Sequence, residues 1–147
     1  MKPNINEEGF GKADYNLQLE DMEGDVMSLQ DLKGKTLFIN FWATWCPPCV
    51  AEMPEIYELY SEMKNEEIAF VMISVDEDPL KLQKFLERKA YDFPVYQLKS
   101  SVPEVFQSSS VPTTFIVSPD GKIVLKHAGM ASYNNDKVKT LLRNISD

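Results

Sequence analysis

The sequence predicts a single α/β domain in which a mixed β-sheet carries helices on both faces. Three observations carry this prediction. Two strongly apolar runs, residues 36–43 and 68–75, are each followed by a helical pattern, which is typical of strand-helix-strand units. Two later strand candidates are joined by a turn sequence and should pair antiparallel. With 147 residues, of which 44% are hydrophobic and 26% charged, the chain can bury one substantial core.

The beginning of the chain divides into an arm and a hairpin. Residues 1–13 are predicted to form a flexible arm, because they show no periodicity and contain two glycines and a proline. Residues 14–147 are expected to form the single domain. It starts with a β-hairpin, since Tyr15–Glu20 alternates polar and apolar side chains, Glu23–Asp25 indicates a turn, and Val26–Leu29 follows.

The two central strands and the helix between them are the most strongly patterned part of the chain. Residues 36–43 are almost all β-branched, aromatic or aliphatic, which predicts a strand buried on both faces. An amphipathic helix is expected from about residue 47 or 48 to residue 63, with a kink at Pro54 because proline removes a backbone hydrogen bond. Residues 68–75 then predict a second buried strand.

The C-terminal half contains a further helix, three strands and a final helix. Asp78-Pro79 supplies an N-cap and a first-turn proline for the second helix. A short strand at 93–98 and a brief helical segment at 104–107 come next. Strands at 113–117 and 122–127 flank the turn sequence Ser-Pro-Asp-Gly, which favours a hairpin. The last helix has apolar residues at i, i+3, i+4 and i+7, namely Val138, Leu141, Leu142 and Ile145.

Composition and charge exclude several classes of partner. The formal net charge is −8, so the surface as a whole repels nucleic-acid phosphates and anionic lipid headgroups. No apolar run approaches the roughly 18 residues that a membrane helix needs. The first residues are polar and acidic, unlike a secretory signal. The compartment stays open on this basis, since a cytoplasmic protein and a domain without its signal or membrane anchor fit equally.

The only two cysteines lie three residues apart in the stretch NFWATWCPPC, where they admit three interpretations. A zinc site needs about four ligands. Besides the two cysteines the chain offers only one histidine, His127, which disfavours a metal site. A structural disulfide over so short a loop stabilises the fold only weakly. The third interpretation is a reacting pair, because a cysteine at the start of a helix faces free N–H groups that stabilise a thiolate.

In the reacting-pair interpretation the two sulfurs have different tasks. Cys46, after the strand and at the helix start, is the expected nucleophile. Cys49 lies one helical turn further on and can attack the resulting mixed disulfide, which releases the partner. Pro47 and Pro48 suit the first helical positions and make the segment rigid. The dithiol itself is then the redox group, and no other cofactor or metal is expected.

The same stretch resembles the active site of the thioredoxin superfamily. The motif WCPPC, the preceding Asn40-Phe41-Trp42-Ala43 and the following Glu52-Met53-Pro54 are similar to TlpA-like and ResA-like thiol-disulfide oxidoreductases, and the likeness runs from about Tyr15 to Ile145. It implies a thioredoxin fold with an N-terminal β-hairpin and an extra strand-helix insertion around residues 76–97. It also implies a reductant of protein disulfides outside the cytoplasm, such as those of apocytochrome c, supplied by a membrane or soluble thiol donor.

The resemblance also assigns residues around the cysteines. It implies a cis peptide bond before Pro112, facing the cysteines, and a Val111 backbone that pairs with an extended substrate. We expect the substrate-contacting surface to consist of a tryptophan, three prolines and a valine: Trp45, Pro47, Pro48, Val111 and Pro112. His127 is expected to be an ordinary surface residue of a strand, and residues 76–78 are expected to be solvated ends of elements.

Glu52 has both an ordinary and a functional interpretation. An exposed glutamate on a helix surface is the ordinary case. Three residues after Cys49, however, Glu52 shares the face of that cysteine and can exchange a proton with it. Thioredoxins proper carry an aspartate at the position of Asn40, which cannot titrate, and ResA-like proteins carry a glutamate at the position of Glu52 that is thought to serve this role.

Two other functions remain open at this stage. A thiol peroxidase of the peroxiredoxin type shares the fold, but such enzymes place a threonine three residues before the reactive cysteine, where this chain has Ala43. A non-catalytic binding module is the second alternative, in which the groove beside Pro112 holds a partner and the cysteines do no chemistry.

Overall fold

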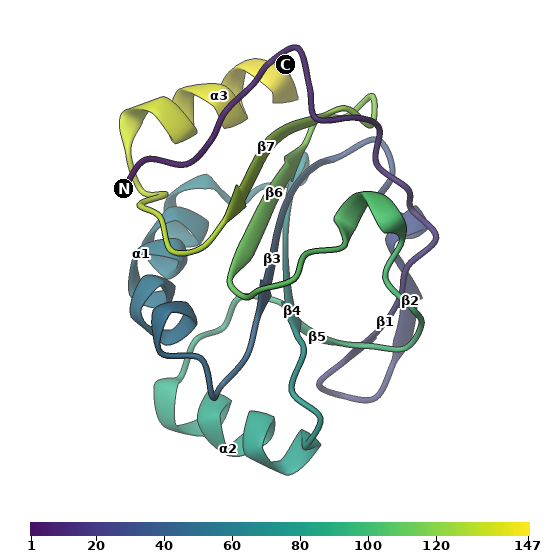
Figure 1. Ribbon diagram of the computed structural model, residues 1–147, viewed down its shortest axis with the longest axis vertical. Helices are drawn as coiled ribbons and strands as arrows, with labels where there is room; N and C mark the ends of the chain where they lie inside the picture. Colours follow the sequence, from purple (N-terminus) through teal and green to yellow (C-terminus); the bar gives the residue numbers. More distant parts are fainter.

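The computed structural model describes residues 1–147 and places seven strands in one sheet of order β2-β1-β5-β4-β3-β6-β7 (Figure 1). The strands are β1 (Gln18–Asp21), β2 (Val26–Ser28), β3 (Thr36–Trp42), β4 (Ile68–Ser74), β5 (Val95–Leu98), β6 (Thr113–Val117) and β7 (Ile123–Ala128). The helices are α1 (Pro47–Met63), α2 (Pro79–Lys89) and α3 (Asp136–Ser146), with short 3-10 helices η1 (Leu29–Leu32) and η2 (Glu104–Phe106).

The sheet is mixed, as the sequence predicts. β3 runs parallel to β4 and antiparallel to β6, and β4 runs parallel to β5. The N-terminal hairpin of β1 and β2 joins this sheet through an antiparallel pairing of β1 with β5. All seven residues of β3 are buried, which explains its nearly continuous apolar sequence. The end of β3 therefore lies in the middle of the sheet, directly before the cysteines.

Alternate side chains of β3 enter two different cores, one on each face of the sheet. Phe38 and Trp42 belong to the core that α1, α2 and α3 cover. Leu37 and Ile39 belong to the core on the opposite face, which the segment before β1, η1 and η2 cover. Helices thus lie on both faces: the three α-helices cover one face, and the short 3-10 helices η1 and η2 cover the other. Figure 1 shows α1 and α3 side by side along that face.

The expected boundaries differ from the observed ones mainly at the N-terminal hairpin. The alternating stretch that starts at Tyr15 becomes a strand only from Gln18 on, although Tyr15 and Leu17 are buried. Leu29 belongs to η1 and not to β2, because Ser28 caps that 3-10 helix with its side chain. Such shifts at element ends arise where a local cap competes with the sheet.

The first 13 residues contain no helix and no named strand, yet they follow the outer edge of β7. Isolated bridges join Ile5 to Leu125 and Lys12 to Lys122. The Asn6 amide donates to the Val124 carbonyl at 2.9 Å. The segment therefore covers an otherwise open strand edge; its expected flexibility stays a prediction.

α1 starts at Pro47 and continues through Pro54 to Met63. The kink expected at Pro54 stays a prediction. None of the helices combines the length and the apolar composition that crossing a bilayer requires.

Candidate active site

The two cysteines form a disulfide at the N-terminus of α1, with their Cα atoms 5.3 Å apart. Cys46 is the N-cap residue, and its backbone is extended while Pro47 is already helical. The Cys49 amide lies 3.3 Å from the Cys46 sulfur and donates to it. This N–H and the helix dipole favour negative charge on the Cys46 sulfur when the pair is reduced.

The two sulfur-bearing residues differ in their access to solvent. Cys46 retains 5% of its surface exposed and Cys49 only 1%. Pro47 and Pro48 follow Cys46 on the exposed surface of the first turn, where their missing N–H groups would have had no partner in the helix. Both cysteines are thus buried in the disulfide form, and Cys49 is the more completely buried of the two.

The residues around Cys46 come from three segments. The Cys46 sulfur lies 3.6 Å from the Val111 carbonyl oxygen. The peptide bond between Val111 and Pro112 is cis, as expected. The Pro112 ring is buried and Val111 is half-buried, so Val111 is the residue of this pair that reaches the surface. Trp45 is 66% exposed and stands beside the nucleophile position, where a partner can contact it.

Trp42 differs from Trp45 although the two are only three residues apart. Trp42 is fully buried and packs against Phe85 of α2 with ring centroids 5.4 Å apart. Trp42 is therefore a core residue, whereas Trp45 lies on the surface.

Glu52 is buried beneath the cysteines, with 2% of its surface exposed, so it is not an ordinary exposed helical glutamate. Its carboxylate accepts a hydrogen bond from the Asn40 side-chain amide at 3.1 Å and another from the Ala131 backbone N–H at 3.2 Å. Asn40 also donates to the Thr114 hydroxyl at 2.8 Å. Strand β3 and the loop after β7 thus meet helix α1 at this carboxyl group, and β6 is linked to it through Asn40.

Burial is the main cause that raises the pKa of Glu52, to about 7. The hydrogen bonds from Ala131 and Asn40 lower the pKa, and the charge of Glu55 raises it. Burial likewise raises the pKa of Tyr133, which is fully buried close to the same group. A carboxyl group with a pKa near 7 can take up and release a proton at neutral pH.

Asp76 is a site residue that the sequence analysis missed. The expectation that residues 76–78 are only solvated ends of elements is wrong for Asp76. Its carboxylate accepts hydrogen bonds from the Thr44 N–H at 3.0 Å, the Thr44 hydroxyl at 2.6 Å and the Ser74 hydroxyl at 2.6 Å. It thereby holds the loop that connects β3 to Cys46. The parallel pairing of β3 with β4 could have indicated this contact. The carboxyl ends of parallel strands meet at one edge of the sheet, which brings Asp76 after β4 close to Thr44 after β3.

Three further site residues also escaped the sequence analysis. Thr114, Ala131 and Tyr133 surround the Glu52 carboxyl group, yet they lie more than 60 positions from it in the chain. No motif marks them. His127, in contrast, is a half-buried residue of β7 paired with Thr114, and no group of three His, Cys, Asp and Glu side chains gathers in a way that could hold a metal ion.

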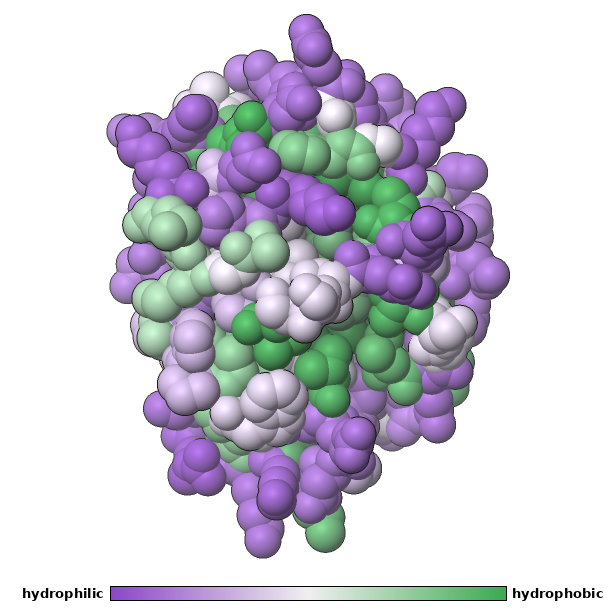
Figure 2. All heavy atoms as spheres, viewed as in Figure 1, coloured by the Kyte–Doolittle hydropathy of each residue, from purple (hydrophilic) through white to green (hydrophobic).

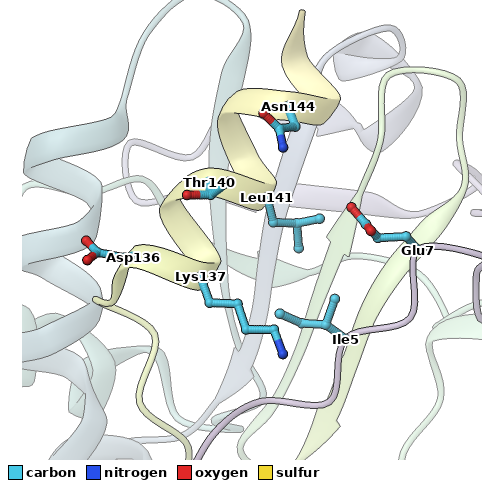
Figure 3. A pocket seen from close by; sticks show the side chains of 7 residues that line it. All are labelled: Ile5, Glu7, Asp136, Lys137, Thr140, Leu141 and Asn144. Carbon is cyan, nitrogen blue, oxygen red and sulfur yellow. The ribbon is translucent and has the colours of Figure 1, made fainter.

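Two cavities differ in their relation to the cysteines. A cavity of about 280 Å³ touches Val111 and is lined by the mainly apolar set Phe41, Val75, Val102, Phe106, Gln107, Ser108, Ser110 and Val111. Figure 2 shows apolar side chains gathered in the lower middle of the visible face, near the ends of β3 and β4. A second cavity of about 440 Å³ lies between the N-terminal arm and α3 (Figure 3). None of the expected site residues lines that second cavity.

Comparisons with known proteins match most of the chain. A family model described as the AhpC/TSA family matches residues 11–126. The thiol-disulfide oxidoreductase ResA of Halalkalibacterium halodurans is 37% identical over 120 residues, which are 81% of this chain and 68% of that protein. The protein of the same name from Bacillus cereus is 37% identical over 121 residues, 82% of this chain and 70% of the relative.

Solved structures give the same picture of the fold. A thiol-disulfide oxidoreductase from Bacteroides vulgatus superposes with a TM-score of 0.73 at 27% identity and covers 87% of this chain and 90% of its own. A structure described as the thiol:disulfide interchange protein DsbE from Chlorobium tepidum has a TM-score of 0.78 at 24% identity. The match covers 93% of this chain and 99% of that one. At that identity the second likeness supports the fold alone.

Proposed function

Because the chain belongs to the AhpC/TSA family and, within it, to the ResA-type thiol-disulfide oxidoreductases, we propose that it reduces disulfide bonds in other proteins. It has a thioredoxin fold and is a thiol-disulfide oxidoreductase whose redox-active group is the Cys46–Cys49 disulfide. One observation carries the proposal: Cys46 caps α1 between the exposed residues Trp45 and Pro47 and is bonded to Cys49, which is almost completely buried.

The reaction starts from the reduced pair. The Cys46 thiolate attacks one sulfur of a substrate disulfide, which forms a mixed disulfide and releases the other substrate sulfur as a thiolate. The Cys49 N–H and the dipole of α1 stabilise the Cys46 thiolate before the attack; Pro47 and Pro48 have no N–H to contribute. Cys46 is the attacking sulfur because it is the more exposed of the two.

The second step closes the disulfide that the structure contains. Cys49 loses its proton and attacks the Cys46 sulfur, which forms the Cys46–Cys49 bond and releases the second substrate sulfur. Two electrons have then passed from the dithiol to the substrate. Glu52 lies one helical turn after Cys49 and is the proposed acceptor of its proton, since a buried carboxylate with a pKa of about 7 is a suitable base.

Substrate recognition is proposed to occur mainly through the backbone. The Val111 carbonyl lies next to the Cys46 sulfur, so an extended substrate segment can pair with this residue while its disulfide reaches Cys46. Trp45 and the exposed prolines Pro47 and Pro48 border the same place. Pro112 contributes by orienting Val111, because its own ring is buried.

The geometry favours an oxidoreductase over a thiol peroxidase. Peroxiredoxin-type enzymes use a threonine three residues before the reactive cysteine, and Ala43 holds that position here. The neighbouring Thr44 does not replace it, because its hydroxyl already donates to Asp76 at 2.6 Å. We therefore expect little peroxide consumption when the protein is supplied with a thiol reductant.

The proposed setting is outside the cytoplasm, where protein disulfides form and persist. There the enzyme would act on selected protein disulfides and would itself be re-reduced by a thiol donor, either soluble or in the membrane. Any attachment to the membrane would depend on a segment outside this chain. Its net charge of −8 disfavours nucleic acid as a partner.

The decisive measurement is the reduction potential of the Cys46–Cys49 pair, obtained by equilibration with glutathione or dithiothreitol. A reductant is expected to have a potential near that of thioredoxin, about −270 mV, whereas a value near that of the oxidant DsbA, about −120 mV, contradicts the proposed direction.

Cys46→Ser should abolish reduction of insulin disulfides, and Cys49→Ser should accumulate mixed disulfides with the substrate. Full activity of Cys46→Ser in partner binding would instead indicate a binding module.

A further inference from the structure

Three glutamates on α1 hold the loop that follows β7. They lie at i, i+3 and i+6, so they form a row along one side of the helix. Glu52 accepts a hydrogen bond from the Ala131 N–H at 3.2 Å. Glu58, at the other end of the row, accepts one from the Asn134 side-chain amide at 3.1 Å.

Glu55 is the middle member of this row and makes two bonds to the same loop. Its carboxylate accepts from the Ser132 hydroxyl at 2.5 Å and from the Asn134 backbone N–H at 2.8 Å. Neither of the two ion pairs in the structure involves Glu55, so these two loop donors are its polar partners. The side chain is half-buried, which makes such bonds stronger than on an open surface.

We propose that Glu55 is a positioning residue for Glu52, because it holds residues 132–134 against α1 and thereby keeps the Ala131 N–H directed at the Glu52 carboxylate. Ser132 is the residue next to Ala131, so a shift of the loop away from Glu55 moves the Ala131 amide as well. Asn134 fixes the other side of the same turn. This inference rests on the proposed proton-accepting role of Glu52.

The charge of Glu55 has a second effect on the same group. Two carboxylates one helical turn apart repel each other, which favours the protonated form of Glu52. The other groups near Glu52 are Asn40 from β3 and the Ala131 N–H, which both donate to it, and Tyr133 from the same loop; Thr114 from β6 is linked to it through Asn40. None of these is a cation, so only the hydrogen bonds from Ala131 and Asn40 oppose the effect of Glu55.

The experiment separates the hydrogen bonds of Glu55 from its charge. Glu55→Gln keeps an acceptor oxygen for the loop but removes the charge, whereas Glu55→Ala removes both. Hydrogen exchange of the Ala131 amide reports the position of the loop, and a carbon NMR titration of the Glu52 carboxyl group reports its protonation. Glu58→Gln is the matched control, since it removes an equal charge from the exposed end of the row.

We expect Glu55→Ala to speed exchange of the Ala131 amide at least about tenfold, while Glu55→Gln changes it less than about threefold. In Glu55→Gln the midpoint of the Glu52 titration should fall by at least about 0.5, the shift expected for charges about 6 Å apart in water, because the surroundings of Glu52 are buried. Unchanged Ala131 exchange in Glu55→Ala overturns the inference, as does an equal shift in Glu58→Gln.

If Glu55→Ala fails to fold, Ser132→Ala tests the same contact by removing one donor, and unchanged Ala131 exchange in that variant also overturns the inference. The positioning role of Glu55 and the proton-accepting role of Glu52 can be tested separately. If the titration midpoint moves in Glu55→Gln but the pH profile of substrate reduction does not follow it, Glu52 is not the proton acceptor, while the positioning by Glu55 stands.

Discussion

At the scale of single residues, Glu52 shows how burial creates a functional group from an ordinary carboxyl. Asn40 and Ala131 hold its carboxylate one helical turn after Cys49, and burial raises its pKa to about 7 although both hydrogen bonds lower it. Asp76 illustrates the opposite case. It remains half-exposed and collects three donors, so its carboxylate orders the loop before Cys46 without entering the chemistry.

The raised pKa of Glu52 predicts a specific dependence of stability on pH. The unfolded carboxyl titrates near 4.5 and the folded one near 7, so stability from this group is complete below pH 4.5 and is lost as the pH rises through 7. The loss amounts to about 3 kcal/mol. Glu52→Gln has no titrating group at this position and does not undergo this loss. The unfolding free energy of the variant minus that of the wild type should therefore increase by about 3 kcal/mol from pH 4.5 to pH 8. Urea unfolding at both pH values measures this, and parallel pH profiles contradict it.

Asp76→Ala should destabilise the protein and slow its reaction. The Thr44 N–H and two hydroxyl groups lose their acceptor, which costs about 1–3 kcal/mol of unfolding free energy. Looser placement of Cys46 should also reduce the rate of substrate reduction. Urea unfolding and insulin reduction give both values. Glu77→Ala removes the same charge from an exposed neighbour and serves as control; an equal loss there would show that the hydrogen bonds to Thr44 are not responsible.

At the scale of elements, the site exists where three segments end together. β3 delivers Cys46 to the start of α1, the cis peptide before β6 brings Val111 to its sulfur, and the loop after β7 closes over Glu52. The N-terminal arm meets this site at one point, where the Met1 carbonyl accepts a hydrogen bond from the Ser132 N–H at 2.8 Å. It adds isolated bridges along the outer edge of β7 and places Ile5 against the core.

Removal of residues 1–8 therefore tests the arm by itself. The truncated protein should lose about 1–2 kcal/mol of unfolding free energy, because Ile5 loses its packing and the Asn6 amide loses its bond to β7. The rate of insulin reduction should stay within about twofold of the wild type. Thermal unfolding and the insulin assay suffice, and a large loss of activity at unchanged stability would mean that the arm contributes to the site after all.

At the scale of the whole molecule, the net charge of −8 influences which partners approach quickly. Association with a basic disulfide-containing protein should be faster than with an acidic one, and the difference should shrink as salt screens the charges over a Debye length of about 8 Å at 0.15 M ionic strength. Reduction rates for one substrate of each charge, measured at low and high salt, check this. A small uncharged disulfide is the control, since its rate should not depend on salt.

The sequence predicted the fold and the reacting pair because both depend on local patterns. Buried strands, amphipathic helices and the spacing of Cys46 and Cys49 are visible within about 20 residues. The surroundings of Glu52 are different in kind, because its partner Ala131 lies 79 residues away and carries no side-chain signal. Asp76 and Thr44 are 32 residues apart and meet only through the pairing of β3 with β4. Contacts made by tertiary packing thus remained outside the reach of local patterns.

The unequal burial of the two sulfurs has a consequence for small thiols. We expect a glutathione molecule that couples to the protein to bind at Cys46, since Cys49 retains only 1% of its surface exposed. The inner sulfur then sits directly behind the adduct and can expel it. Blocked forms of the protein should accordingly be short-lived, and recovery from them requires no second enzyme.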